Sequence, residues 1–419
     1  MANDTILQSF KINKVLLIAI LYFFFNSVFL PHGLLYTTLL APILFLSFSY
    51  RGQIKFIEFI AIALIPYSGI HFFIVPDLKS LAISTALLIL NLVFIAAFYD
   101  YLKKKRDLTY QYYKITIINF IFFIAALLLF FTPWKEVFWH IKPLTRNIDD
   151  FSRLSFLTYE PSYYSTLLAP IFLFYMLKVV LFRDQQKKTF PLLVFTGLPL
   201  VFSFSFGVIG GIIIAFIVLI LFYNKHILKK RLFFYFFSTS IFLIILGLVV
   251  LSILYPENVV FQRVSDIFTG EDTSAKGRTL GAFKMAYLIA KEKSILFGAG
   301  LGQIKIVGED IIRNYYHYNV ADIPTLRIPS SIGETLASFG VVGVLVRLGL
   351  QFYFFLKTKT YNNFYRFFIF VYIFIYQFTG SYLTNIAEYV LWVIAFTPAF
   401  VQFDVFNKQA TQSQEKETI

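Results

Sequence analysis

The sequence contains no cysteine, few histidines and little charge. Without cysteine, the chain cannot form a disulfide, a thiolate nucleophile or a cysteine-ligated metal site. Charged residues make up 14% of the 419 residues, whereas soluble domains carry about 25%. A histidine-rich metal site is not expected either, because the chain has only five histidines: His32, His71, His140, His226 and His317.

Hydrophobic residues are correspondingly abundant. They account for 58% of the chain, which includes 54 phenylalanines and 27 tyrosines. A soluble core could not bury that much apolar surface, and exposed apolar patches above a few hundred Å² promote association. The composition therefore excludes a soluble enzyme, a disordered protein and a disulfide scaffold, and it predicts an integral membrane protein.

The apolar segments predict an all-α, polytopic membrane protein with about 12 transmembrane helices. One transmembrane domain is expected over residues 1–406, followed by a polar, disordered cytoplasmic tail at 407–419. The apolar run at 189–223 is long enough for a helical hairpin with its break near Phe204–Gly207. The expected spans are 13–30, 33–50, 54–75, 79–98, 113–133, 162–182, 189–204, 206–223, 232–254, 335–356, 367–383 and 386–404.

The basic residues predict the orientation, because short cytoplasmic loops are enriched in Lys and Arg. The net charge of +14 comes from 37 basic and 23 acidic residues. Four basic loops share one side of the membrane if both termini are cytoplasmic. Lys11 and Lys14 lead directly into a full-length span, which is not the pattern of a cleavable signal. The basic loops are 103–106, 183–188, 225–231 and 357–366.

Two segments on the opposite side are longer than ordinary connections. One covers about 134–161, and the large extracytoplasmic loop between spans nine and ten covers about 255–334. Both carry basic residues on the side where few are expected. Long loops can escape the charge rule, so these residues are either ordinary surface charges or ligands for an anionic substrate.

Three arginines of the large loop, Arg278, Arg313 and Arg327, are the anion-binding candidates. A guanidinium group stays charged, and its planar fork matches the oxygens of phosphate. A solvated surface charge is the alternative for each of them.

Between Arg278 and Arg313, the spacing predicts a helix over 279–294 on the outer membrane surface. The glycine-rich segment Gly298–Gly302 follows this helix. It is more simply a glycine turn than a phosphate loop, because no nucleotide-binding strand precedes it. The predicted apolar stripe of the helix consists of Leu280, Phe283, Tyr287 and Ala290.

Candidate bases lie in both long loops. Glu160 precedes Pro161 at the start of a span, so it either stabilises the helix N-terminus or acts as a general base at the membrane mouth. His317 lies in a Tyr- and Asn-rich segment that suits carbohydrate binding, or it is an ordinary loop histidine. His140, beside Trp139 and Trp134, is most simply part of an interfacial aromatic belt.

Three further charged residues belong to spans ten and twelve. Glu334 begins span ten, seven residues after Arg327, but Pro329 argues against a continuous helix between them. Arg347 lies within span ten, where a charge is costly, and Glu388 of span twelve is a possible partner. The pair is either structural or lines a wet cavity.

Four motifs in order along the chain resemble the O-antigen polymerase and ligase superfamily. Arg153 with Glu160-Pro-Ser162 resembles an Arg…Glu-Pro-Ser element that opens a span, and Phe202–Gly207 resembles a Ser-rich element. Two later motifs resemble the family's Ser…Arg…Phe-Gly-x-Gly-x-Gly element and the element that returns the chain to the membrane: Ser274…Arg278…Phe297–Gly302 and Gly333-Glu334…Phe339–Gly343. With the twelve-span layout, the resemblance covers the whole chain.

The resemblance implies a bacterial inner-membrane enzyme that acts on undecaprenyl-diphosphate-linked glycans at the outer face. The implied activity is a polysaccharide polymerase (for O-antigen, capsule or exopolysaccharide) that inverts the anomeric carbon without a metal or other cofactor. The implied partners are a lipid-linked oligosaccharide and membrane lipid, with a chain-length regulator protein as a further candidate. No nucleic-acid partner is expected.

In this interpretation Glu160 is the first candidate for the general base and His317 the second, and Glu334 is a further catalytic candidate. The leaving diphosphate would be stabilised by arginines in a partly dehydrated site. Arg278, Arg327 and Arg313 are assigned to that role, and Arg153 to the diphosphate of the other lipid.

Three observations bear on the alternatives. Ligases of the superfamily carry His-Asn before the returning Glu, whereas this chain has Ile328-Pro329-Ser330, which favours a polymerase. A flippase or other transporter is expected to have short loops and internal symmetry, but this chain has a long outer loop and no repeat. The first outer loop, Pro31-His32-Gly33, has no acidic residue, which favours a metal-independent mechanism.

Overall fold

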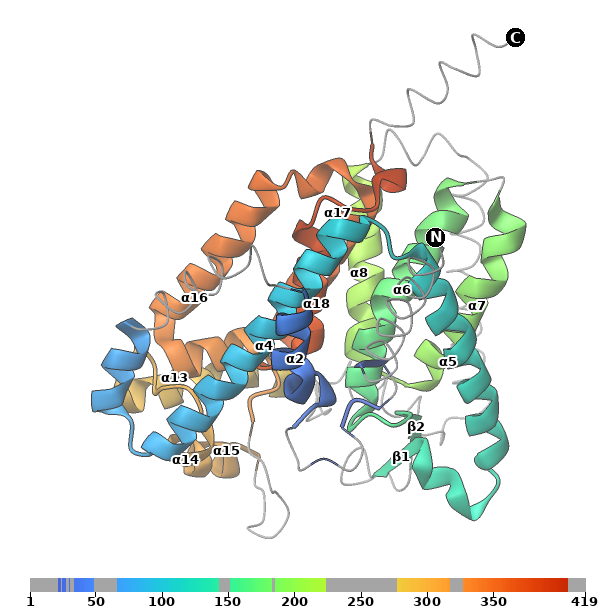
Figure 1. Ribbon diagram of the computed structural model, residues 1–419. Helices are drawn as coiled ribbons and strands as arrows, with labels where there is room; N and C mark the ends of the chain where they lie inside the picture. The colour runs from blue at the N-terminus through green and yellow to red at the C-terminus, as the bar shows by residue number, and fades with distance from the viewer. Residues whose placement is uncertain are drawn as a thin grey trace.

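The computed structural model describes residues 22–23, 25–27, 30, 34–48, 66–142, 151–182, 185–223, 277–316 and 327–405. Within these ranges the chain is mostly helical and contains one two-stranded antiparallel sheet (Figure 1). The helices are α2 (Tyr36–Phe48), α4 (Leu78–Lys105), α5 (Thr109–Leu129), α6 (Pro161–Leu181), α7 (Gln186–Phe202), α8 (Phe206–Phe222), α13 (Ala282–Lys293), α14 (Ile304–Val307), α15 (Glu309–Tyr316), α16 (Ser331–Lys357), α17 (Phe364–Thr379) and α18 (Ile386–Phe396), and the strands are β1 (Trp139–Lys142) and β2 (Phe151–Leu154).

Four of the described helices are long and apolar enough to cross a membrane: α4, α5, α6 and α16. Three shorter helices, α8, α17 and α18, are also apolar. These helices agree with an all-α protein embedded in a membrane. The spans expected at 13–30, 54–75 and 232–254 lie wholly or mostly outside the described residues, as does the tail at 407–419. The number of twelve spans therefore stays a prediction.

Helix boundaries follow from local sequence signals. The predicted hairpin break is confirmed, since α7 ends at Phe202 and α8 begins at Phe206. Side chains of Asp77, Ser330 and Asn385 accept backbone N–H groups at the starts of α4, α16 and α18. Each such cap is typically worth about 1 kcal/mol.

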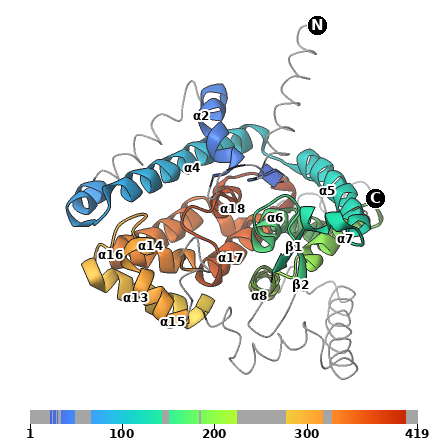
Figure 2. The ribbon, with the colours of Figure 1, turned by 90° about the horizontal axis from the view of Figure 1, so that it is seen from below.

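The helices form two groups on either side of α17 and α18, with α5–α8 on one side and α13–α16 on the other (Figures 1 and 2). Helix α6 is central, and 78% of its most apolar window is buried. Only 11% of the corresponding window of α16 is buried. The exposed side chains of α16 are apolar and include Leu345, Val346 and Leu350, as expected for a helix that faces lipid.

Helix α16 is broken at Gly340, where the backbone has φ 67° and ψ −167°. In a straight helix the Cα atoms of Ser331 and Arg347 would be about 24 Å apart. Here the Arg347 guanidinium donates to the Ser331 carbonyl at 3.4 Å and to Thr335 Oγ1 at 2.9 Å. The break therefore brings the two halves of the helix close enough for one side chain to join them.

The glycine-rich segment Gly298–Gly302 supports this break. The N–H groups of Ala299 and Gly300 donate to the carbonyls of Ala337 and Ser338, at 2.8 and 3.0 Å, which the break releases from the helix. A Cβ on Gly298 would lie 2.5 Å from the Ser338 carbonyl carbon. The close approach that these glycines permit is therefore to the backbone of α16, which agrees with a structural turn.

Helix α13 packs against α16, and it does so mainly with residues outside its apolar stripe. Its buried residues are small or aliphatic: Ala282, Met285, Ala286, Ile289 and Ala290. Of the predicted apolar stripe, Leu280 and Tyr287 are exposed, Phe283 is half-buried and Ala290 is buried. Most of the stripe therefore points away from α16, and its contact with the outer membrane surface stays a prediction. Alanines allow the close approach to α16, which side-chain hydrophobicity alone does not reveal.

One end of the bundle collects the basic connections, and we call it the basic end. Helix α4 finishes there with Lys103–Lys105, and α16 finishes there with Lys357. The N–H of Phe400 donates to the Arg106 carbonyl at 2.9 Å, which places the end of α18 beside the end of α4.

The opposite end contains the glycine-rich segment, and we call it the loop end. The Gln303 amide donates to the Asp77 carbonyl at 2.8 Å, directly before α4 begins. Because α4 has 28 residues, its two ends are about 42 Å apart. The N-termini of α6, α16 and α18 share the loop end with the hairpin of β1 and β2 (Figure 1).

Candidate functional site

A small pocket at the loop end brings Glu160 and Arg278 together, and we call it the Glu160 pocket. It lies where the start of α6, the short π-helix Gly277–Gly281 before α13 and the connection from α17 to α18 converge. Its walls are polar and aromatic, and they include Tyr159, Glu160, Ser162, Arg278, Tyr382 and Asn385. These residues come from three regions of the sequence more than 90 positions apart, so only the fold can assemble them.

Glu160 is the residue immediately before α6, as the sequence predicts, but its carboxylate makes no capping bond to the helix backbone. Instead it accepts a hydrogen bond from the Ser162 hydroxyl. The Thr158 hydroxyl holds the turn, since it donates to the Ser155 carbonyl at 2.7 Å and lies 3.1 Å from the Glu160 carbonyl. The carboxylate therefore lines the pocket and is not committed to capping the helix.

Tyr159, beside Glu160, supplies a neutral donor group to the pocket. Burial, and then the neighbouring Glu160 carboxylate, raise the pKa of the Tyr159 phenol well above its ordinary value. The phenol therefore stays protonated at any physiological pH and can donate a hydrogen bond to a sugar oxygen.

Arg153 and Arg278 both approach the turn between α7 and α8. Arg153, on strand β2, donates from Nε to the Ser203 carbonyl at 3.1 Å. A Cβ placed on Gly207, at the other end of the turn, would lie 4.0 Å from the Arg278 guanidinium. The Ser203 hydroxyl in turn accepts from Ser165 of α6 at 2.6 Å. The Ser-rich turn thus lies against both arginines, although Arg153 is not among the residues that line the Glu160 pocket.

Arg327 reaches the same region through Tyr382. Its guanidinium carbon lies 5.0 Å from the centroid of the Tyr382 ring, a cation–π contact. Tyr382 lines the Glu160 pocket, and Arg327 is exposed beside it. Tyr382 is not among the residues predicted from the sequence. The signal that could have identified it is the mostly polar segment Gly380–Asn385, which separates two apolar helices.

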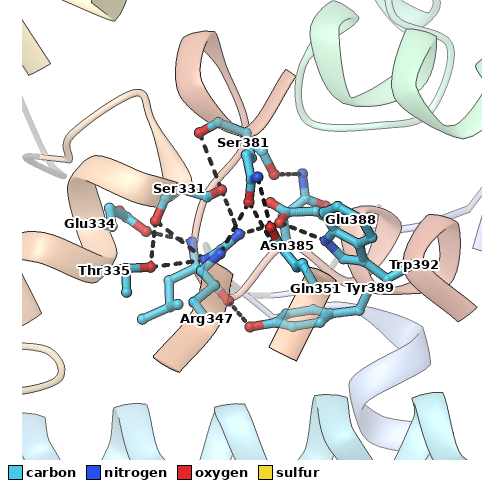
Figure 3. Close-up of polar contacts among 12 residues, drawn as sticks. Ser331, Glu334, Thr335, Arg347, Gln351, Ser381, Asn385, Glu388, Tyr389 and Trp392 are labelled. Atoms are coloured by element: carbon cyan, nitrogen blue, oxygen red, sulfur yellow. Dashed lines mark hydrogen bonds and ion pairs between the residues drawn. The ribbon is translucent and has the colours of Figure 1, made fainter. Parts of the chain in front are cut away.

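Arg347 and Glu388 form an ion pair within the apolar part of the molecule (Figure 3). The guanidinium also donates to Gln377 at 3.2 Å, and the Trp392 indole donates to Glu388 at 3.2 Å. One oxygen of Glu388 is buried without a hydrogen-bond partner. The structure therefore brings together the two residues considered as a pair from the sequence, and it adds a polar network from α16, α17 and α18.

Glu334 is buried near this network and supports the connection that carries Tyr382. Its Oε2 accepts from the backbone N–H of Leu383 at 2.6 Å. Glu334 is not among the residues that line the Glu160 pocket. It is therefore placed to position the neighbouring Tyr382 and not to contact a ligand in that pocket.

Arg313 is not among the residues that line the Glu160 pocket. Arg313 pairs with Glu309 of the same helix, α15, at 2.8 Å, and Ile312 of that helix packs in the core that α13 and α16 share. His317 lies outside the described residues. Within the described ranges, no group of three or more His, Asp and Glu side chains could hold a metal ion.

Comparison with known proteins adds no assignment. No protein-family model matches this chain, and no curated protein is similar to it. The functional interpretation therefore depends on the residues and their arrangement.

Proposed function

We propose that this protein is a membrane glycosyltransferase that polymerises a bacterial surface polysaccharide from undecaprenyl-diphosphate-linked repeat units. One observation carries the proposal: Glu160 and Arg278, which are 118 positions apart (278 − 160), line the same pocket at the loop end. Glycosyl transfer from a diphosphate involves an incoming hydroxyl, which a carboxylate can deprotonate, and a leaving group, which a guanidinium can stabilise.

The transfer would proceed as a single displacement. Glu160 takes the proton of the acceptor sugar hydroxyl, and the oxygen attacks the anomeric carbon of the donor glycan from the face opposite the diphosphate. The bond from that carbon to the diphosphate oxygen breaks, and its electron pair leaves with undecaprenyl diphosphate. Arg278 and Arg327 stabilise the negative charge that develops, and the proton held by Glu160 is then released to water.

The loop end would face the outer side of the bacterial cytoplasmic membrane, with the basic end and both termini on the cytoplasmic side. The lysines at the ends of α4 and α16 support this orientation, since short basic connections stay cytoplasmic. Lipid-linked repeat units would reach the pocket from the outer leaflet, and growth of the polymer would proceed outside.

The test compares a variant that lacks the Arg278 side chain with a variant that lacks an exposed lysine of the adjacent helix α13. In a host that lacks the natural gene, Arg278→Ala should abolish polymer while single repeat units remain. Lys291→Ala, on the exposed face of α13, is the matched control and should retain the polymer ladder. Wild-type chain lengths from Arg278→Ala would remove Arg278 from the site.

A transporter of lipid-linked oligosaccharide is the second candidate. The observation that favours it is the broken helix α16 with the buried Arg347–Glu388 pair, since discontinuous helices with internal charges are common in transporters. Purified protein in proteoliposomes distinguishes the two. Polymer formation without a transmembrane gradient supports the polymerase, and lipid translocation without polymer supports the transporter.

A further inference from the structure

A second cavity, of about 430 Å³, lies beside the Glu160 pocket, between the hairpin of β1 and β2 and the turn before α6. We call it the hairpin pocket. Tyr159 lines both pockets, so the two share a wall. The other lining residues that matter here are Glu136, Val137, Trp139, His140 and Ser155.

The lining of the hairpin pocket suits a neutral, hydroxyl-rich ligand. It presents a carboxylate, an imidazole, three aliphatic hydroxyls and the Tyr159 phenol, beside the buried aromatic residues Trp139 and Phe156. Such polar groups donate to and accept from sugar hydroxyls. Among the described residues that line it there is no Lys or Arg, whereas the Glu160 pocket contains Arg278. Phosphate oxygens would be attracted to the Arg278 guanidinium, which the hairpin pocket does not offer.

The walls of the hairpin pocket are held in place by internal hydrogen bonds. The Trp139 indole donates to the Ala126 carbonyl of α5 at 2.9 Å, which fixes strand β1 against that helix. The Ser155 N–H donates to the Phe138 carbonyl at 3.0 Å, and the Thr158 hydroxyl donates to the Ser155 carbonyl at 2.7 Å. A cavity with fixed walls is pre-organised for a ligand.

We propose that the hairpin pocket binds the neutral glycan of the acceptor. Its volume lies within the range of about 300–1,000 Å³ that is usual for ligand pockets. Because Tyr159 lines both pockets, a glycan in the hairpin pocket would lie next to the pocket that Glu160 lines. The assignment of this glycan as the acceptor rests on the proposed polymerase function, whereas binding of a glycan does not.

The experiment blocks the hairpin pocket at its exposed rim and measures binding of two probes. Val137 is 43% exposed and lines the pocket, so Val137→Trp narrows it without disturbing the core. Phe131→Trp, at a position that is 88% exposed and does not line the pocket, is the matched control. The probes are the free repeat-unit oligosaccharide, released by mild acid from the host's lipid-linked precursors, and undecaprenyl diphosphate.

Val137→Trp should weaken binding of the oligosaccharide by about tenfold or more. This is the affinity that one or two net hydrogen bonds between the pocket and the sugar provide. Its binding of undecaprenyl diphosphate should be unchanged, and Phe131→Trp should bind both probes like the unmodified protein. Arg278→Ala should show the opposite pattern. Thermal unfolding of each purified variant in detergent verifies that the fold is retained.

The outcomes separate this inference from the proposed function. If Val137→Trp selectively loses the oligosaccharide in a protein that forms no polymer, the glycan site stands and the polymerase function fails. If the protein polymerises but Val137→Trp binds the oligosaccharide like the control, the glycan site is overturned and the polymerase function stands.

Discussion

At the scale of single residues, the pocket depends on side chains that hold one another in place. Tyr382 has two roles: it lines the Glu160 pocket, and its ring makes a cation–π contact with the Arg327 guanidinium. Neither role requires ionisation of the phenol. The ring and the hydroxyl can therefore be tested separately.

Tyr382→Ala should form polymer about two- to fivefold more slowly than Tyr382→Phe. This ratio corresponds to the free energy of an exposed cation–π contact. The Phe variant keeps the ring under Arg327, and the Ala variant removes it. The measurement is the initial rate in proteoliposomes with purified lipid-linked repeat units. Equal rates for the two variants would show that the contact with Arg327 has no role in catalysis.

The buried Arg347–Glu388 pair makes a residue-scale prediction about stability. Glu388→Leu leaves the guanidinium buried without its counter-ion and should destabilise the fold by about 3–5 kcal/mol. The double variant Arg347→Met with Glu388→Leu should be more stable than Glu388→Leu alone, because no unpaired charge remains. Thermal unfolding in detergent measures both, and a double variant as unstable as the single one contradicts this account.

At the scale of elements, the break in α16 is decided by glycines. Gly298 and Gly340 have φ values of 79° and 67°, where residues other than glycine are strained. A Cβ on Gly340 would also overlap the carbonyl group of Leu296. The backbones of the glycine-rich segment and of α16 therefore lie closer together than a Cβ atom at either glycine would allow.

Gly298→Ala and Gly340→Ala should each destabilise the protein by about 2 kcal/mol or more, from backbone strain and overlap. Gly349→Ala, in the same helix α16 but with open space around it, should be neutral or slightly stabilising. The three variants are compared by thermal unfolding. If Gly349→Ala were as destabilising as Gly340→Ala, the effect would belong to helix α16 in general and not to its break.

The start of α4 is a second element with a testable property. The Ser80 hydroxyl and the backbone N–H groups of Lys79 and Ser80 hold the pKa of the Asp77 carboxyl below its usual value. A lowered pKa in the folded state stabilises the protein above the unfolded pKa of about 4. This contribution is lost as the pH falls through the lower pKa of the folded state.

The backbone N–H groups of Lys79 and Ser80 donate hydrogen bonds to the Asp77 carboxylate. Acidification from pH 6 to pH 3 should therefore increase the rate of hydrogen exchange at these two amides. In Asp77→Asn the same amides should show a smaller change over this range, once the intrinsic pH dependence of exchange is removed. Mass spectrometry of peptides from this region provides the measurement. The same response in both proteins would rule out Asp77 as its source.

At the scale of the whole molecule, the basic end and the loop end define an axis. Helix α4 joins the two ends, and its length of about 42 Å exceeds the apolar thickness of a bilayer, about 30 Å. The candidate pocket lies at one end and the lysine-rich connections at the other. The proposed function requires these ends to be on opposite sides of the membrane.

The absence of cysteine makes this topology directly testable by single-cysteine labelling. Lys291→Cys on α13 should react with an impermeant maleimide in intact spheroplasts, whereas Lys104→Cys at the end of α4 should react only after permeabilisation. Lys357→Cys should behave like Lys104→Cys, because both lie at the basic end. If positions 291 and 104 were labelled from the same side, the basic end and the loop end would not lie on opposite sides of the membrane.

Several features were predictable from the sequence because they depend on local interactions. Composition predicted membrane embedding, Pro161 predicted the start of α6, and polar residues predicted the hairpin break between α7 and α8. The face that α13 buries was not predictable, because it contains alanines that become buried only where α16 approaches closely. Hydrophobic periodicity reports how apolar a face is but not which helix it meets.

For the candidate site, the sequence by itself determined which residues have suitable chemistry, namely carboxylates and guanidinium groups in two long loops. Only the tertiary structure decided which of them meet. Arg278 reaches the pocket of Glu160, Arg313 is held by Glu309, and Tyr382 enters from a connection without any motif. The physical reason is that these contacts join distant segments through the packing of α6, α17 and the broken helix α16, whereas spacing along the chain records only neighbours on one helix.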